Sequence, residues 1–149
     1  MRLEDVESLA KYQCDPRYSE HYATLPDARA IVEAAMSWSR EVPRRNYQFA
    51  IARSEGVNAI GCIGLRGADQ PNGVAEFGCE LAPELWGAGL AHEASVAMIA
   101  FARQELRLKR VVAWSTLSND RAQHLVRRLG FVREVIGETA VRYDLSIEK

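Results

Sequence analysis

Apolar residues occur at two spacings along the chain, and each spacing predicts a different element. Apolar residues three or four positions apart predict helices over residues 3–12, from about 24–27 onward, over 90–106, and from Ser118 or Asn119 to just before Gly130. Residues 14–25 are expected to form a loop, with Thr24 capping the helix that follows and Asp27 three residues on, as in a capping box. Alternating or β-branched runs predict a first strand that begins at residue 46 and five further strands over residues 59–65, 74–82, 110–116, 131–136 and 141–147.

The order of these elements defines the expected fold class. Turns at Glu55-Gly56 and at Gly137 make antiparallel hairpins of the first two and the last two strands. The strand over 110–116 lacks alternation, as expected when both its faces are covered. We therefore predict an α/β (α+β) domain over residues 1–149, with a mixed, mainly antiparallel sheet of about six strands flanked by about four helices.

Composition excludes several functional classes. The chain has 149 residues, 48% of them hydrophobic, and a net charge of −1, which gives no reason to expect a nucleic-acid partner. No apolar run approaches the roughly 20 residues that cross a membrane. The acidic start of the chain does not resemble a signal peptide, so we expect no membrane association and a cytoplasmic location. Three cysteines without C-x-x-C spacing and three scattered histidines predict no disulfide framework and no metal site.

The stretch L-A-P-E-L-W-G-A-G-L-A-H-E-A over residues 81–94 carries the first chemical signal. Gly87 and Gly89 allow a tight turn directly before a helix, whose first N–H groups and positive dipole end suit an anion such as phosphate. The dinucleotide fingerprint requires a third glycine where His92 stands, and the P-loop requires a Gly-Lys-Ser/Thr that is absent. Both common nucleotide-binding interpretations, including a domain of Rossmann type, therefore lose support.

The strand that leads into this turn has two unlike faces. One parity is apolar, whereas the other carries Glu76, Gly78 and Glu80. Two carboxylates four residues apart on a strand lie about 13 Å from each other, which is too far for a glycosidase pair. One carboxylate could act alone as a general base, and a solvent-facing row on an antiparallel strand is the alternative. A strand end followed by a phosphate turn suits a long ligand with amides along its arm, which is the shape of an acyl-coenzyme A.

Two segments together resemble the GNAT superfamily of N-acetyltransferases, and more narrowly the branch with the ribosomal-protein N-terminal alanine acetyltransferases. They are A-E-F-G-C-E-L-A-P-E-L-W-G-A-G-L-A-H-E-A and S-N-D-R-A-Q-H-L-V-R-R-L-G-F. The resemblance implies acetyl-CoA as cosubstrate. Its phosphate loop, Q/R-x-x-G-x-G/A, falls on Trp86, Gly87, Ala88, Gly89, Leu90 and Ala91, with Trp86 in place of Gln or Arg. Leu81 and Ala82 would pair with the pantetheine arm through their main chain, and Asn119 would hydrogen-bond the same arm.

The resemblance is less complete for the catalytic residues. Val126 stands where many family members carry a tyrosine acid, and Ala122 stands where the alanine-transferring branch often has a serine. Ser118 is the nearest remaining hydroxyl in sequence, with a helix cap as its alternative role. Glu76 matches the position of a base for the incoming ammonium in several members. The expected reaction is direct attack of a neutral amine on the thioester through a tetrahedral intermediate, without an enzyme nucleophile.

The acceptor is expected to be a primary amine on a protein N-terminus or a small molecule. Substrate-binding candidates are Tyr22 and Trp38, together with Tyr18, His21 and the hairpin over 134–142, although such aromatics pack in the core more often than they line a substrate site. A non-catalytic acyl-CoA-binding or regulatory module on the same fold is the alternative function, motivated by Val126 and Ala122. The family's opening strand is truncated or replaced here, so a partner such as a second copy in a homodimer could cover that sheet edge.

Overall fold

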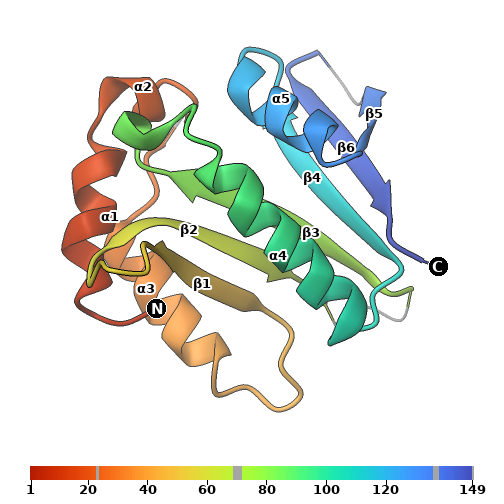
Figure 1. Cartoon of the computed structure of the whole chain (residues 1–149), viewed down its shortest axis with the longest axis horizontal. Helices are drawn as coiled ribbons and strands as arrows, with labels where there is room; N and C mark the ends of the chain where they lie inside the picture. Colours follow the sequence, from red (N-terminus) through yellow and green to blue (C-terminus); the bar gives the residue numbers. More distant parts are fainter. Residues whose placement is uncertain (23, 69–71, 136–137, 149) are drawn as a thin grey trace.

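The computed structural model describes residues 1–22, 24–68, 72–135 and 138–148 (Figure 1). Its helices are α1 (Asp5–Gln13), α2 (Pro16–Ser19), α3 (Ala28–Trp38), α4 (Leu90–Gln104) and α5 (Asp120–Arg128), with a short 3-10 helix η1 (Pro83–Leu85). Its strands are β1 (Tyr47–Ala52), β2 (Ala59–Arg66), β3 (Val74–Leu81), β4 (Arg110–Thr116), β5 (Val132–Val135) and β6 (Ala140–Ser146). The mixed α/β class and the six-stranded sheet are confirmed in this described part.

The sheet has the order β1-β2-β3-β4-β6-β5, and its pairs are antiparallel except for β3 with β4. The parallel pairing joins Val74–Phe77 to Arg110–Ala113 and stops there, although both strands continue. Figure 1 shows the two strands spreading apart beyond this point. The sheet therefore consists of two arms, β1-β2-β3 and β4-β6-β5, that are joined only over the first half of β3.

Helices cover the two faces of the sheet unequally. One hydrophobic core packs α4 and α5 against the sheet and includes Phe77, Met98 and Val111. The other places α1 and α3 over the β1-β2 side and includes Leu9 and Val32. The two-sided pattern predicted for β3 is confirmed, because alternate residues from Ala75 to Leu81 pack toward α4 whereas Glu76 and Gly78 are exposed on the opposite face.

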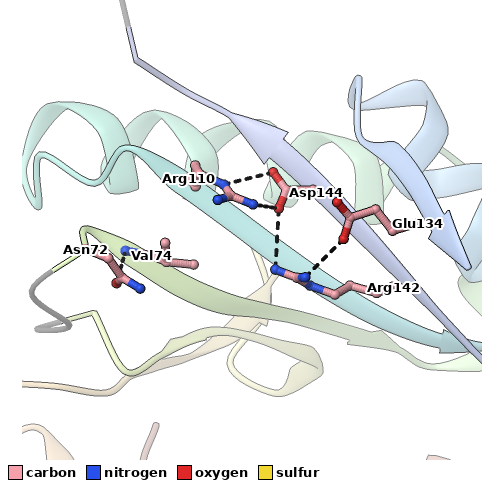
Figure 2. Close-up of polar contacts among 6 residues, drawn as sticks. All are labelled: Asn72, Val74, Arg110, Glu134, Arg142 and Asp144. Carbon is pink, nitrogen blue, oxygen red and sulfur yellow. Dashed lines mark hydrogen bonds and ion pairs between the residues drawn. The ribbon is translucent and has the colours of Figure 1, made fainter. Parts of the chain in front are cut away.

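A ladder of ion pairs braces the β4-β6-β5 arm on the face away from α4 (Figure 2). Arg110 of β4 contacts Asp144 of β6, and this contact raises the pKa of the Arg110 guanidinium. Arg142 of β6 lies 3.0 Å from Glu134 of β5 and 3.5 Å from Asp144. Alternating positive and negative groups across three strands hold the second arm together as one unit.

Two local predictions were wrong in detail, and a third had left two capping residues open. Asp27 caps α3, because its carboxylate accepts hydrogen bonds from the Arg29 and Ala30 amides, and Thr24 has no such role. The expected loop after α1 contains α2, which Asp15 caps and Pro16 starts. The helix after β4 is capped by Asn119 rather than Ser118. The predicted turn at Gly137 lies outside the described residues.

The edge of the sheet at β1 is open. Among the residues that the structure describes, no strand precedes α1, and β1 pairs with β2 alone. A homodimer that covers this edge stays a prediction. In the same part of the chain, none of the helices has the length and apolar character required to cross a membrane.

Candidate functional site

A cavity of about 700 Å³ opens where the two arms of the sheet separate. Its floor begins at Phe77 and Ala113, the last paired residues of β3 and β4. Its walls come from the end of β3, the turn before α4, α5, and the α2 region. The volume falls in the range of pockets that hold cofactors. The divergence of the two parallel strands thus creates the site.

Backbone groups of β3 line the cavity where β4 has moved away. Ala82 donates its N–H to the Ile60 carbonyl, and its own carbonyl accepts from Leu85, so both of its main-chain groups are used. Because successive residues of a strand point their backbone groups to opposite sides, Cys79 and Leu81 direct theirs toward the open side. The Leu81 carbonyl accepts one hydrogen bond there, from the Trp86 indole at 2.8 Å. Of the two residues predicted to pair with a ligand arm, Leu81 faces the cavity and Ala82 does not line it.

The turn before α4 has the backbone that its glycines predict. Gly87 and Gly89 adopt φ angles of 83° and 81°, and Gly89 is the N-cap of α4 without any side-chain capping bond. Trp86, both glycines, Leu90 and Ala91 line the cavity, while Ala88 between the glycines is exposed. The first amides of α4 therefore remain without side-chain capping partners at the cavity wall, which is the arrangement that binds phosphate at a helix N-terminus.

A carboxylate held by tyrosines occupies the other end of the cavity. Glu80 accepts hydrogen bonds from the Tyr12 and Tyr22 hydroxyls, each at 3.3 Å. Tyr18 stacks on Tyr22 with ring centroids 4.8 Å apart. Burial, together with the negative charge of Glu80, raises the pKa of all three tyrosines, so they remain neutral hydrogen-bond donors. Glu80 lines the cavity together with three of the predicted substrate-binding candidates, Tyr18, His21 and Tyr22.

Charged side chains of both signs line the cavity. The guanidinium groups of Arg121, Arg127 and Arg128 belong to α5, and the carboxylates are those of Asp120 in α5 and Glu80 in β3.

The comparisons with known proteins agree with this geometry. A family model described as an acetyltransferase (GNAT) domain matches residues 1–132. The chain belongs to the GNAT acetyltransferases. The uncharacterized N-acetyltransferase p20 of Bacillus licheniformis is 30% identical over 139 residues, which cover 90% of this chain and 77% of that protein. GNAT enzymes transfer acetyl groups from acetyl-CoA, so this chain is an acetyl-CoA-dependent acetyltransferase.

Two solved structures share the GNAT fold over almost the whole chain. A putative ribosomal-protein-serine acetyltransferase of Vibrio cholerae has a TM-score of 0.82 and 18% identity, covering 98% of this chain and 90% of its own. A spermidine N-acetyltransferase of Vibrio cholerae, in complex with CoA and spermine, has a TM-score of 0.79 and 18% identity, covering 98% of this chain and 92% of its own. At these identities the likeness concerns the fold.

The two α5 positions at which the resemblance to GNAT enzymes would place a serine and a tyrosine carry Ala122 and Val126, which have no hydroxyl. The Asn119 side-chain oxygen accepts from the Ala122 amide at 3.0 Å, which leaves its NH₂ group available at the cavity wall. Ala122 and Val126 line the cavity with aliphatic surface. Ser118 is exposed outside the lining, and its hydroxyl lies 3.2 Å from that of Thr116. The structure thus brings Asn119 to the GNAT cleft and places Ser118 beside it.

Two other predicted residues lie away from the cavity. Glu76 is exposed, does not line the cavity, and makes no hydrogen bond or ion pair within the described residues. Its cross-strand neighbour Arg66 donates to Gln48 at 3.0 Å and stacks on the Trp38 ring at 4.4 Å. Trp38 therefore packs against an arginine and is absent from the cavity lining.

Cys79 lines the cavity on the α4 side of β3. Burial raises the pKa of its thiol to about 12, which keeps the group protonated near neutral pH. A buried thiol is a poor nucleophile, because the thiolate is the reactive form. Within the described residues, no group of three or more His, Cys, Asp or Glu side chains could hold a metal ion.

Proposed function

We propose that residues 1–149 act as one domain that moves an acetyl group from acetyl-CoA directly to a primary amine. The observation that carries this proposal is the cavity between the arms of the sheet. One end presents free backbone groups and a phosphate-type turn, and the other presents a carboxylate held by two tyrosines. The two substrates would meet near Gly78, where an added side chain would find no atom within 4 Å.

The coenzyme half of the proposal uses main-chain groups. The main chain of Cys79 and the N–H of Leu81, whose carbonyl already accepts from the Trp86 indole, would pair with the pantetheine arm in place of the missing β4 neighbour. The amides from Gly87 to Ala91 would bind the pyrophosphate. Asn119 would donate its NH₂ group to the same arm. Ala82 is left out, because its N–H and carbonyl already have partners. Trp86 would contribute its side chain, rather than its backbone amide, to the coenzyme end of the cavity.

The acceptor half places Glu80, rather than Glu76, as the group that receives the proton of the ammonium. Glu80 lies in the cavity and is held in position by Tyr12 and Tyr22, whereas Glu76 is exposed outside it. A carboxylate at this end also attracts the cationic form of the amine. Tyr22 would contact the acceptor, and Trp38 would act only through Arg66 and the fold.

The leaving thiolate needs little help in this site. A thiol has an unperturbed pKa of about 8.5, so its anion departs more readily than an alkoxide. The aliphatic Ala122 and Val126 offer no proton, and the protonated Cys79 offers no nucleophile. The reaction is therefore direct transfer through a tetrahedral intermediate, and it depends mainly on the positioning of the two substrates.

The acceptor is either a small amine or a protein N-terminus. Proteins with this fold include a spermidine N-acetyltransferase and a putative ribosomal-protein-serine acetyltransferase, which supports testing both small amines and peptides as acceptors. The experiment measures thiol release from acetyl-CoA with a panel of alkylamines, polyamines and short peptides. Release that requires one class of amine supports the proposal and names the class.

A non-catalytic acyl-CoA-binding module is the competing function, because Val126 and Ala122 remove the usual hydroxyls. Titration with coenzyme A and with acetyl-CoA separates the two. Tight binding of both, with no thiol release for any acceptor in the panel, would favour the binding module. Absence of binding would remove both functions.

A further inference from the structure

Trp86 and Arg121 stand on opposite arms of the cleft and contact each other across it. Trp86 follows β3 and η1, while Arg121 lies in the first turn of α5, after β4. The Arg121 guanidinium carbon is 5.0 Å from the centroid of the Trp86 ring, and both residues line the cavity. Sheet hydrogen bonds between the arms end at Phe77 and Ala113. The cation–π contact therefore links the arms beyond the point where backbone pairing stops.

The Trp86 ring is a fixed surface for this contact. Its indole N–H donates to the Leu81 carbonyl at 2.8 Å, which holds the ring against the end of β3. The face of an indole carries negative charge density and attracts a guanidinium. Trp86 thus determines where the charge of Arg121 lies.

Arg121 is exposed and keeps its hydrogen-bonding edge free. In the described part of the chain, its guanidinium makes no hydrogen bond or ion pair and interacts with the Trp86 ring alone. A guanidinium that stacks through its face still directs its N–H groups outward in its plane, in a fork that matches phosphate oxygens. The amides of the Gly87–Ala91 turn line the same cavity. A cation and a set of backbone donors are therefore available to one anionic group.

We propose that Trp86 positions Arg121 to bind the pyrophosphate of coenzyme A. The phosphate-loop pattern that this chain resembles has Gln or Arg at position 86 itself. Here the tryptophan at that position holds a guanidinium supplied by α5 from the opposite arm. The inference rests on the coenzyme site proposed above. The bound phosphate would then contact both arms of the cleft. Because Arg121 would contact the phosphate and not the reacting atoms, its loss should weaken coenzyme binding and leave the transfer step largely unchanged.

The test is calorimetric titration of coenzyme A and of dephospho-coenzyme A, which retains the pyrophosphate and lacks the 3′-phosphate. Arg121→Ala is expected to weaken both ligands equally, by roughly 10–100-fold, as for loss of a charge-assisted hydrogen bond. The KM for acetyl-CoA rises by a similar factor, and kcat changes by less than about twofold. Arg103→Ala, which removes an exposed arginine near the far end of α4, is the matched control and changes neither value.

Two variants of Trp86 test its positioning role. Trp86→Phe keeps an aromatic face but loses the indole N–H, whereas Trp86→Ala loses both. The alanine variant is expected to bind coenzyme A about 2–5-fold more weakly than the phenylalanine variant, as for an exposed cation–π contact. In the Arg121→Ala background this difference between the two Trp86 variants disappears.

Three results would overturn the proposal. Equal binding by wild type and Arg121→Ala removes the phosphate role. If Arg121→Ala weakens binding of coenzyme A but not of dephospho-coenzyme A, Arg121 binds the 3′-phosphate rather than the pyrophosphate. Equal behaviour of Trp86→Phe and Trp86→Ala removes the positioning role of the ring. A wild-type protein that binds neither ligand would instead contradict the proposed function itself.

Discussion

Replacement of the cavity carboxylate, Glu80→Gln, is expected to remove most of the acetyl transfer and to leave coenzyme binding intact. The Tyr12 and Tyr22 hydroxyls, each 3.3 Å from a Glu80 oxygen, hold this side chain at the acceptor end. Glutamine keeps the shape of the side chain but cannot take the ammonium proton. Loss of a positioned general base lowers the rate by about 10²–10⁴, which is about 3–5 kcal/mol of transition-state stabilisation.

Glu76→Gln is the matched control for this change. It removes the same charge from the same face of the same strand, but at an exposed position outside the cavity. We expect kcat/KM to stay within about twofold of wild type, as for most surface substitutions. The titration of coenzyme A should give the same affinity for both variants and for wild type, because neither carboxylate lies at the phosphate turn.

The assay is thiol release from acetyl-CoA as a function of pH. Where the acceptor is already neutral no base is required, so the Glu80→Gln defect should shrink as pH rises. For a peptide N-terminus it should fade above about pH 8, and for an alkylamine only toward about pH 10. Normal activity of Glu80→Gln, combined with loss of activity in Glu76→Gln, would refute this reasoning and return the base to the exposed residue.

Further predictions concern the turn and the tyrosine cluster. Gly89→Ala forces a non-glycine residue to φ 81°, so it should lower the free energy of unfolding by about 1–2 kcal/mol in a denaturant titration and weaken coenzyme A by about tenfold or more in calorimetry. Tyr18→Phe removes a buried hydroxyl that has no hydrogen-bond partner within the described residues, so chemical denaturation at pH 7 should show stability unchanged or raised by up to about 1 kcal/mol, and a loss of 2 kcal/mol or more would mean that the hydroxyl is paired. The pKa values of Tyr12 and Tyr18 are raised in the folded state, so the folded protein retains protons that the unfolded chain loses. The contribution of these two tyrosines to the free energy of unfolding should therefore be constant below about pH 10 and decrease above it by about 1.4 kcal/mol per pH unit for each tyrosine, and Tyr18→Phe should reduce this slope.

The fold could be predicted because its signals are local. Hydrophobic periodicity within each segment gives the helices and strands, and the two glycines before α4 require the positive φ angles that they adopt. Helix caps could not be assigned from the sequence, because Thr24 and Asp27 are both good capping residues and only the folded helix shows which side-chain oxygen reaches the free amides. Residues 14–25 contain α2, a helix of one turn that is too short to show hydrophobic periodicity in the sequence.

The choice between two carboxylates could not be made from the sequence. Glu76 and Glu80 share one parity of β3, so alternation places them on the same face and distinguishes nothing further. The difference comes from Tyr12 and Tyr22, which lie 68 and 58 positions from Glu80 in the chain. A cluster of tyrosines before the sheet was the available signal, but their contact with Glu80 depends on how α1 packs against β2 and α2 packs against α1.

The same limit applies to the aromatic residues. Trp38 and Tyr22 look equivalent in the sequence, yet Trp38 stacks on Arg66 whereas Tyr22 lines the cavity. The contact between Trp86 and Arg121 joins residues that follow different strands, and it exists only because β3 and β4 diverge to the right separation. Long-range packing, rather than local propensity, decides which polar and aromatic groups share the site.

The central claim is that acetyl-CoA lies between the diverging ends of β3 and β4. A crystal structure of the protein with bound coenzyme A tests it most directly. The account predicts the pantetheine arm beside Cys79 and Leu81, the pyrophosphate on the amides from Gly87 to Ala91, and the thiol directed toward Glu80. A coenzyme bound outside this cleft, or with its thiol directed away from Glu80, would contradict it.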